Sequence, residues 1–260
     1  MPGVAALRSS SAAPLVVALG VDDLLVAPWQ DDATGNVAVQ TLDGHQLTAT
    51  VIGRAPGTGL TVLRADQSLP GLDVGACANM TTGSVIDVAA GRETFTGRIS
   101  ETYTLVALLD GPPIGPAIRI ELERPAPTTG APVILHGGKV IAIVVATADH
   151  ALYAVPVEVA TTSARSLAGG DRSLAWLGIG GNDTNAGPTI TEVERSSPAA
   201  LAGLKAGDVI EAFDATSVGS MWSVLVHVRS VSVGSTVVVA VRRDGIRLEL
   251  RVVLTALNVA

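Results

Sequence analysis

Short apolar or alternating runs recur about every ten residues between Pro14 and Val159, and this spacing restricts the fold more than any other feature of the chain. Turns that carry Asp-Gly, Gly-Gly, Pro-Gly or Gly-Pro-Pro separate the runs. In the stretch QLTATVI, Leu47, Ala49 and Val51 alternate with polar residues, as in a strand with one buried face. No long amphipathic helix interrupts the series. The pattern therefore predicts an all-β region of sandwich or barrel type.

The composition provides material for packed cores and limits the possible partners. Apolar residues form 48% of the 260 residues, whereas charged residues form 16%. This length suits two compact domains, or one large β domain with a smaller one. The formal net charge of −7 argues against nucleic acid as a partner, because phosphate binding needs clustered Lys and Arg.

Residues that could hold a metal are sparse. Cys77 is the single cysteine, which excludes an intramolecular disulfide and a cysteine-based zinc site. The four histidines, His45, His136, His150 and His227, are far apart and lack the spacing of metal ligands. We therefore expect no metal and no cofactor, and we interpret the histidines as surface or loop residues.

The segments that flank the β region differ from it in composition. Residues 1–13 are small and polar and predict a flexible lead-in. The early apolar run Pro14–Val21 is too short to span a bilayer, so we interpret it as the first strand. Residues 160–172 are rich in Ser, Thr, Gly and Ala and predict a linker that begins as a short helix. The expected domains are therefore 14–159 and 173–257.

The last ninety residues have a different pattern, with helices between the strands. SSPAALAGL predicts a short helix, because a serine precedes it and Pro198 stands just inside it. SMWSVLVHVRS predicts a second helix, at residues 220–230. Asp244 and Gly245 predict the turn of a hairpin between two apolar strands.

This C-terminal region resembles the PDZ domains of bacterial HtrA (DegP-like) proteases. The stretch SSPAALAGLKAGDVIEAFD carries the resemblance, and the order WLGI, SPAALAGL, AGDVI, helix, VRRDG is specific. It covers about residues 173–256. The stretches LDGHQLTATVIGRAPGTGLTVLR, GAPVILHGGKVIAIVVA and ALYAVPV are similar in order and spacing to the protease domain of the same family. The resemblance implies a mainly β chain: a trypsin-like double six-stranded β-barrel, then a PDZ domain, which is a β-sandwich with two helices.

In this family a serine attacks the scissile carbonyl, a histidine takes its proton, and an aspartate orients the histidine. The histidine position, fourteen residues before Asp43, corresponds to Trp29, whose indole nitrogen can only donate. The aspartate position corresponds to Gly59, which has no side chain, and the serine position to Thr129. The position two residues before the nucleophile, which should supply an oxyanion-hole N–H, is Pro127, which has none.

These four replacements imply a pseudoprotease. A threonine hydroxyl without a neighbouring general base is a poor nucleophile, and His136 lies beyond a strand at the HGGK turn. Thr128 and Thr129 are otherwise ordinary turn residues that satisfy backbone groups. Residual serine-type endopeptidase activity is the alternative that the fold keeps open.

The resemblance also implies a peptide groove in the PDZ domain. The loop that holds the ligand's terminal carboxylate corresponds to Trp176, Leu177, Gly178 and Ile179, where the glycine permits a tight turn. Arg172 could add positive charge to this loop through a water, or it could be a solvated linker residue.

The opposite wall of the groove is expected to be the helix from Ser220 to Arg229. Val224 and Val228 should face the groove and form an apolar floor with Leu177 and Ile179, which favours an apolar last residue on the ligand. His227 or Ser223 should lie near the rim, and the alternative for His227 is an exposed position on the helix.

The sequence thus favours a catalytically inactive protein that captures protein C-termini or extended peptides as a scaffold or regulator. A chaperone-like quality-control factor is the second alternative. Family members assemble through aromatic residues near the N-terminus, and the first 28 residues contain none, which favours a monomer or a weak oligomer. The resemblance implies an extracytoplasmic bacterial protein of the periplasm or cell envelope, with any membrane anchor lying outside this chain.

Overall fold

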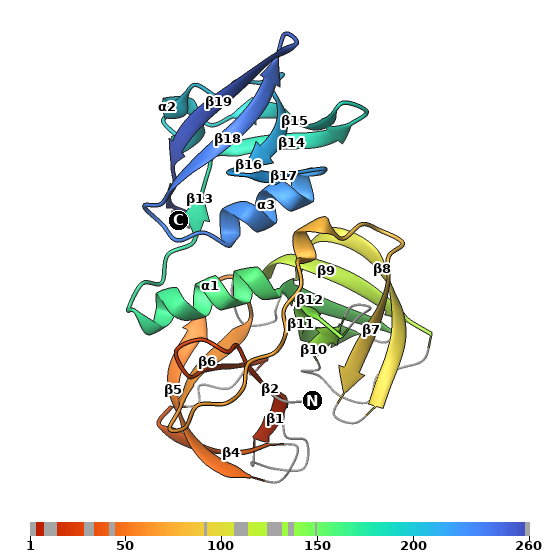
Figure 1. The fold of residues 1–260 in the computed structure, drawn as a ribbon, viewed down its shortest axis with the longest axis vertical. Coiled ribbons are helices and arrows are strands. Elements are labelled where there is room, and N and C mark those ends of the chain that lie inside the picture. The colour runs from red at the N-terminus through yellow and green to blue at the C-terminus, as the bar shows by residue number, and fades with distance from the viewer. Residues whose placement is uncertain are drawn as a thin grey trace. The chain divides into compact units, whose positions relative to one another are not determined.

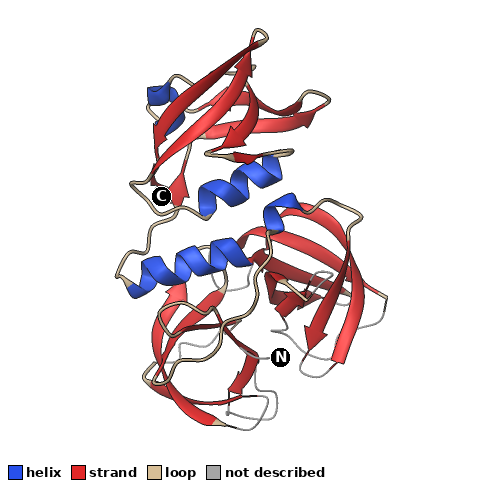
Figure 2. Cartoon of the chain, in the orientation of Figure 1, coloured by secondary structure: helices blue, strands red, loops and turns tan. Residues whose placement is uncertain are grey.

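The chain folds into two compact units, 1–172 and 173–260 (Figure 1). The computed structural model describes residues 4–7, 15–28, 34–41, 45–90, 93–106, 114–123, 132–134, 138–148 and 150–257. Strands predominate in both units (Figure 2), which confirms the predicted mainly β fold.

The first six strands form a closed barrel with the order β1-β2-β3-β6-β5-β4. Their bounds are β1 Val4–Leu7, β2 Leu15–Ala18, β3 Leu24–Ala27, β4 Asn36–Thr41, β5 Gln46–Ala55 and β6 Leu60–Ala65. Leu47 and Ala49 of β5 are buried among other apolar side chains, whereas Gln46, Thr48 and Thr50 are exposed. The alternation in the sequence therefore identifies the buried face of this strand correctly.

The next six strands close a second barrel with the order β10-β11-β12-β9-β8-β7. They are β7 Val85–Ala90, β8 Glu93–Val106, β9 Ile114–Leu122, β10 Pro132–Ile134, β11 Val140–Ala148 and β12 Ala151–Pro156. The apolar runs TFTGRIS and TLVALL belong largely to one long strand, β8, rather than to two. The predicted double six-stranded barrel is confirmed.

Two predicted boundaries of the first unit need correction. The lead-in 1–13 contains β1, which pairs with both β2 and β4, because the barrel needs a strand between those edges to close. The predicted linker 160–172 is largely helix: α1 spans Val157–Ala168 and packs against strands of both barrels. Ala160, Ala164 and Leu167 recur at helical spacing and are buried, which gives α1 its apolar face.

A buried carboxylate ties the start of α1 to the connection between the barrels. Glu158, in the first turn of α1, accepts a hydrogen bond from the backbone N–H of Cys77 at 2.7 Å through Oε1. Cys77 begins a short 3-10 helix, Cys77–Asn79. Oε2 of Glu158 is buried, and no described residue bonds to it. Burial raises the pKa of Glu158, although its backbone hydrogen bonds oppose this shift.

The second unit is a sheet with the order β14-β15-β16-β18-β19, with β17 paired to β16 and a separate pair β13-β20. Its elements are β13 Ala175–Trp176, β14 Ile179–Thr184, β15 Gly187–Val193, α2 Pro198–Ala202, β16 Val209–Phe213, β17 Thr216–Ser217, α3 Met221–Arg229, β18 Thr236–Arg243, β19 Ile246–Val253 and β20 Thr255–Ala256. Both predicted helices and the predicted hairpin turn at Asp244–Gly245 are present. The side chain of Ser197 caps α2, as the sequence predicts.

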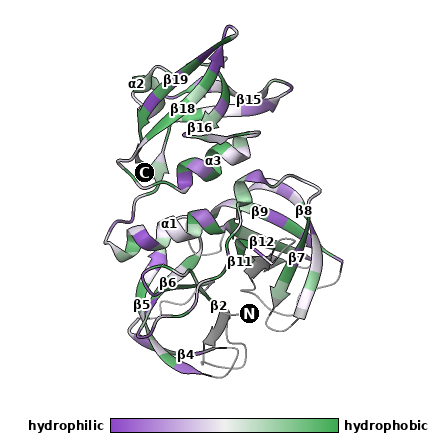
Figure 3. Cartoon of the chain, viewed as in Figure 1, coloured by the Kyte–Doolittle hydropathy of each residue, from purple (hydrophilic) through white to green (hydrophobic). Residues whose placement is uncertain are grey.

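The core of this unit lies between the sheet and the helices. β18, which is apolar over most of its length (Figure 3), contributes Val237, Val239 and Val241. A buried ion pair ties its C-terminal end to the α2–β16 connection: Arg243 binds both carboxylate oxygens of Asp208, at 2.6 and 2.8 Å. Burial of Asp208 raises its pKa, but the hydrogen bonds from Arg243 and from the Lys205 N–H outweigh this effect and lower it.

Candidate functional site

The turn between β5 and β6 lies against the second barrel. Thr58 is fully buried; its hydroxyl donates to Ala55 O at 2.9 Å and accepts the Leu60 N–H at 3.2 Å. The Gly115 N–H donates to Gly57 O at 2.9 Å, which joins this turn to β9. The turn is therefore held rigidly at the seam between the two barrels.

Gly59 is the position that the sequence analysis matches to the family's aspartate, and the side chain of Ile114 crowds it in the structure. Its φ of 66° is left-handed, which disfavours any residue with a β-carbon. A β-carbon at Gly59 would lie 2.2 Å from Cδ1 of Ile114, whose side chain is almost completely buried. The terminal methyl group of an apolar side chain from the second barrel thus lies beside the point where a β-carbon of residue 59 would stand.

The other proposed triad and oxyanion positions, Trp29, Pro127 and Thr129, lie outside the described residues, as do Thr128 and His136. Gly59 is therefore the one replaced position whose surroundings the structure gives. The described residues contain no group of three or more His, Cys, Asp or Glu side chains that could hold a metal ion. None of the helices in the described ranges is both long and apolar enough to cross a membrane.

The second candidate site is the groove between β14 and α3. β14 is an edge strand of the sheet, because β15 is its one partner among the strands that the structure describes. An edge strand offers unpaired backbone groups to which a peptide can add as a further strand. The N-terminus of α3 is fastened to the far end of β14, since the Met221 N–H donates to Asp183 Oδ1 at 2.6 Å.

The loop that leads into β14 has the geometry of an anion site. Leu177 O accepts the Ala199 N–H at 2.9 Å, and Gly178 O accepts the Glu194 N–H at 3.0 Å. Because a trans peptide unit directs its N–H opposite to its C=O, the N–H groups of Gly178 and Ile179 point away from these partners. Two adjacent amides directed outward are suited to a carboxylate.

Gly178 cannot be exchanged in this loop without strain. Its φ is 81°, and a β-carbon there would lie 2.2 Å from Cβ of Ser197. The tight turn that the sequence suggests at this glycine is therefore enforced both by the backbone and by α2. Trp176 also crowds this position, with Cζ2 3.0 Å from where the β-carbon would be.

The structure brings most of the predicted groove residues together. Leu177, Val224 and Val228 are buried in one apolar core, and Ile179 packs against it. They are the residues that the sequence analysis predicts as the apolar floor of the groove. Arg172 belongs to the first unit, and one of its guanidinium nitrogens lies 3.6 Å from where a β-carbon of Gly53 would be. Its contribution to the carboxylate loop stays a prediction.

His227 is neither exposed nor turned toward β14. Its ring stacks on Phe213 of β16, with centroids 6.3 Å apart and an interplanar angle of 5°. Met221, which does face β14, lies six positions earlier, so the two side chains leave α3 about 120° apart. Burial lowers the pKa of His227, and the Asp214 carboxylate partly opposes this shift. Ser223 is buried and takes part in the capping box of α3 with Ser220.

Sequence analysis missed one groove residue, Met221. A β-carbon on Gly181 of β14 would lie 2.8 Å from Cε and 2.9 Å from Sδ of Met221, so the thioether lies against this strand. The pair Gly180–Gly181 in the edge strand was the available signal, because a glycine in a strand often marks the close approach of another group.

The comparisons with known proteins agree with this architecture. Residues 175–254 match the family model of the PDZ domain. Two curated relatives carry the name "Probable periplasmic serine endoprotease DegP-like". The one from Halomonas elongata is 27% identical over 238 residues, 82% of this chain and 50% of the relative. The one from Pseudomonas savastanoi pv. phaseolicola is 28% identical over 258 residues, which cover 87% of this chain and 52% of the relative. The chain spans about half the length of these relatives.

Solved structures support the same fold. The HtrA-type protease AlgW with a decapeptide aligns over 100% of this chain and 97% of its own, with a TM-score of 0.54 and 20% identity. The alignment with the serine endoprotease from Yersinia pestis covers 99% of this chain and 95% of that protein's chain, with a TM-score of 0.52 and 21% identity. Two closed barrels followed by a PDZ domain define the class of trypsin-fold proteins that carry a peptide-binding module. Within that class, the chain is an HtrA/DegP-like protein with a PDZ domain.

Proposed function

We propose that the chain is a catalytically inactive HtrA-like protein, a pseudoprotease, that acts as a peptide-binding scaffold or regulator. Its PDZ domain captures C-terminal or extended peptides. The barrel unit retains the protease fold without the chemistry. By analogy with the periplasmic relatives, we place this function outside the cytoplasm, with protein partners rather than nucleic acid.

The observation that carries the proposal is Gly59 against Ile114. In serine proteases, loss of the orienting carboxylate alone lowers kcat by about 10⁴-fold. Here the space for that carboxylate is taken by a buried apolar side chain, with Cδ1 2.2 Å from where a β-carbon would be. The sequence adds three further replacements, Trp29, Pro127 and Thr129, each of which removes a separate requirement for catalysis.

The geometry of the PDZ groove supports the binding half of the proposal. A free edge strand, an outward-facing pair of amides at Gly178 and Ile179, and an apolar base beneath them are the parts that strand addition needs. The Met221 thioether lies against Gly181 of this strand, and we expect a ligand strand that pairs along β14 to displace it. We therefore expect binding of modest affinity that depends on the terminal carboxylate.

Peptide binding to the full chain tests the binding half directly. Labelled peptides with free apolar C-termini are titrated beside amidated twins, and we expect saturable binding that amidation abolishes. Gly178→Ala should remove this binding, whereas Gly203→Ala should keep it. Both glycines have positive φ, but only the β-carbon at residue 178 meets other atoms. Equal affinity for both peptide twins would contradict a carboxylate loop.

Casein degradation tests the inactive half. We expect no cleavage and no labelling by a serine-directed phosphonate. Cleavage at an ordinary protease rate that Thr129→Ala abolishes would establish the endopeptidase alternative instead. Suppression of aggregation by a chain whose groove is blocked by Gly178→Ala would favour the chaperone-like alternative.

A further inference from the structure

The sheet of the PDZ unit has a second edge, formed by β19 at the opposite end of the strand order from β14 (Figure 1). β18 is the one partner of β19 among the strands that the structure describes. Seven of the eight residues of β19 are at least partly exposed, whereas the inward-facing valines of β18 are buried. An edge strand of this kind is a template on which another chain can pair.

Hydrogen bonds show which backbone groups of β19 point away from the sheet. The Leu254 N–H donates to Ser235 O at 2.9 Å, on the side of β18. Val238, which stands opposite Arg251, bonds instead to Asp214 on its other side, through both its N–H and its C=O. Because polar groups alternate along an antiparallel strand, the odd-numbered residues of β19 direct theirs outward. These residues are Arg247, Glu249, Arg251 and Val253.

The side chains of β19 complement a second copy of the same strand. Glu249, 63% exposed, stands between Arg247 and Arg251 on the exposed face. In an antiparallel pair with a two-fold axis at Leu250, Glu249 of each copy lies opposite Arg251 of the other. Both residues have outward-directed backbone groups, so this pair also exchanges two backbone hydrogen bonds. All residues in the range 247–253 then have a partner.

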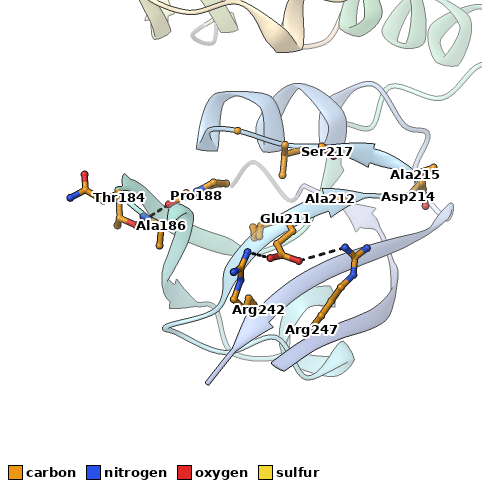
Figure 4. A pocket seen from close by; sticks show the side chains of 15 residues that line it. Thr184, Ala186, Pro188, Glu211, Ala212, Asp214, Ala215, Ser217, Arg242 and Arg247 are labelled. Atoms are coloured by element: carbon orange, nitrogen blue, oxygen red, sulfur yellow. Dashed lines mark hydrogen bonds and ion pairs between the residues drawn. The ribbon is translucent and has the colours of Figure 1, made fainter. Parts of the chain in front are cut away.

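The ion pairs already present distinguish this register from the alternative that the charges permit. An axis two residues earlier would place Arg247 opposite Glu249. However, Arg247 lines a cleft beside Glu211, whose carboxylate lies 3.6 Å away (Figure 4), and it lies 3.5 Å from Glu249 of its own strand. Arg251 is exposed and has no ion pair with a described residue. The register centred on Leu250 therefore supplies the carboxylate that Arg251 lacks.

Apolar side chains gather at the same edge. Five large apolar residues are exposed in the described part of the chain, and three of them belong to β19 or to α2, which packs beside it: Ile246, Val253 and Leu201. Leu248 and Leu250 of β19 are only half-buried. Exposed apolar side chains that lie together mark interaction surfaces, and a second copy of β19 would cover several of these.

We propose that two copies of this chain pair antiparallel through β19, with the two-fold axis at Leu250, and so join their PDZ sheets into one. Because β14 lies at the other edge of each sheet, both peptide grooves stay free. The pair then presents two grooves, which favours partners that carry two binding segments. This inference goes beyond peptide capture and does not depend on it.

Sedimentation equilibrium of the full chain from about 1 μM to about 1 mM tests the association. We expect a mass that rises with concentration toward that of two chains. Glu249→Arg should weaken the association by about tenfold or more, because the symmetric pair then brings like charges together twice. Adding Arg251→Glu to this variant should restore the association to within about threefold. Glu192→Arg is the matched control, since it makes the same charge change at an exposed position of the interior strand β15.

Disulfide formation tests the register. Cys77 is buried, so a cysteine introduced on β19 is the accessible thiol. Leu250→Cys would bring two α-carbons to about 4.5 Å across the axis, within the range of a disulfide. We expect a covalent dimer under mild oxidation, and little of it from Leu248→Cys, the same substitution two residues away. Thermal unfolding checks that each variant folds like the unmodified chain.

Three results would overturn the inference. The mass of a single chain at every concentration would mean that β19 does not pair copies. An association that Glu249→Arg leaves unchanged would place the contact elsewhere. Faster crosslinking of Leu248→Cys than of Leu250→Cys would refute the register. Each of these results leaves the proposed peptide capture intact, because the groove lies at the other edge of the sheet.

Discussion

Adding one carbon atom at Gly59 should destabilise the barrel unit, and this prediction tests the reasoning about the lost aspartate. A left-handed φ of 66° costs an alanine about 1–2 kcal/mol relative to glycine. The new β-carbon would also lie 2.2 Å from Ile114 Cδ1, where about 3.5–4.0 Å is needed. Overpacking of this kind costs about 1–3 kcal/mol. Reduced freedom of the unfolded chain returns at most about 1 kcal/mol.

We therefore expect Gly59→Ala to lower the free energy of unfolding of the first unit by about 1–4 kcal/mol. Urea unfolding followed by far-UV circular dichroism measures the loss, and hydrogen exchange of residues 46–65 assigns it to the first unit. Gly83→Ala is the matched control. Gly83 has a φ of 92° in the same unit and has no atom within 4 Å of its β-carbon position. Gly83→Ala should therefore lower the free energy of unfolding only by the cost of the left-handed backbone.

A double-mutant cycle isolates the contact itself. Ile114→Val removes Cδ1, so Gly59→Ala should cost at least about 1 kcal/mol less in the Ile114→Val background than in the unmodified chain. If the cycle shows no coupling, then Ile114 does not fill the space beside residue 59. The structural argument for lost catalysis would then fail.

Three further perturbations test other parts of the structure. Asp208→Asn should lower the free energy of unfolding of the PDZ unit by about 3 kcal/mol in urea titrations. This value is near the lower end of the range for a broken buried ion pair, because the side chain of Arg243 stays 23% exposed. An unchanged urea midpoint would contradict a stabilising ion pair. Since burial raises the pKa of Glu158 in the folded chain, stability from its protonated form is complete below the ordinary pKa and is lost as pH rises through the folded value. Glu158→Gln should thus flatten the fall in thermal stability as pH rises above the ordinary pKa of a glutamate, and an unaltered profile would refute this role. Met221→Ala should tighten the binding of free-ended peptides, because a groove that the Met221 side chain fills for part of the time lowers the apparent affinity. Leu201→Ala, which changes an exposed residue, is the control. Equal peptide affinities of the Met221→Ala variant and the unmodified chain would mean that Met221 does not obstruct the groove.

Much of the fold follows from local patterns in the sequence, and the exceptions have a common cause. Alternation and turn residues predict the strands, and helix caps predict α2 and α3. The short stretch Val4–Leu7 has no such signal, because its strand character comes from pairing with β2 and β4 rather than from its own residues. The merging of two runs into β8 likewise depends on β7 and β9, its partners on either side. Pairing between distant segments is not contained in a local pattern.

The same limit applies to the candidate sites. The position of Gly59 could be found from the order of motifs, but Ile114, which fills the space beside it, comes from the other barrel. Met221 likewise lies far in sequence from Gly181. His227 illustrates a related limit: a helix can be predicted from its sequence without knowing its rotation about its own axis, and so without knowing which side chains face the sheet. Its stacking on Phe213 follows from the rotation of α3, which the packing of Val224 and Val228 sets.

Gly59 and Gly181 mark two obstructions that differ in kind. Ile114 is nearly fully buried, so a movement of its side chain must be accommodated by a closely packed core. Met221 is unbranched, has three rotatable bonds and is only half-buried, so its thioether can leave the groove at small cost. We therefore expect a ligand to move the Met221 side chain more readily than the Ile114 side chain. The proposed function, peptide capture without cleavage, predicts this difference.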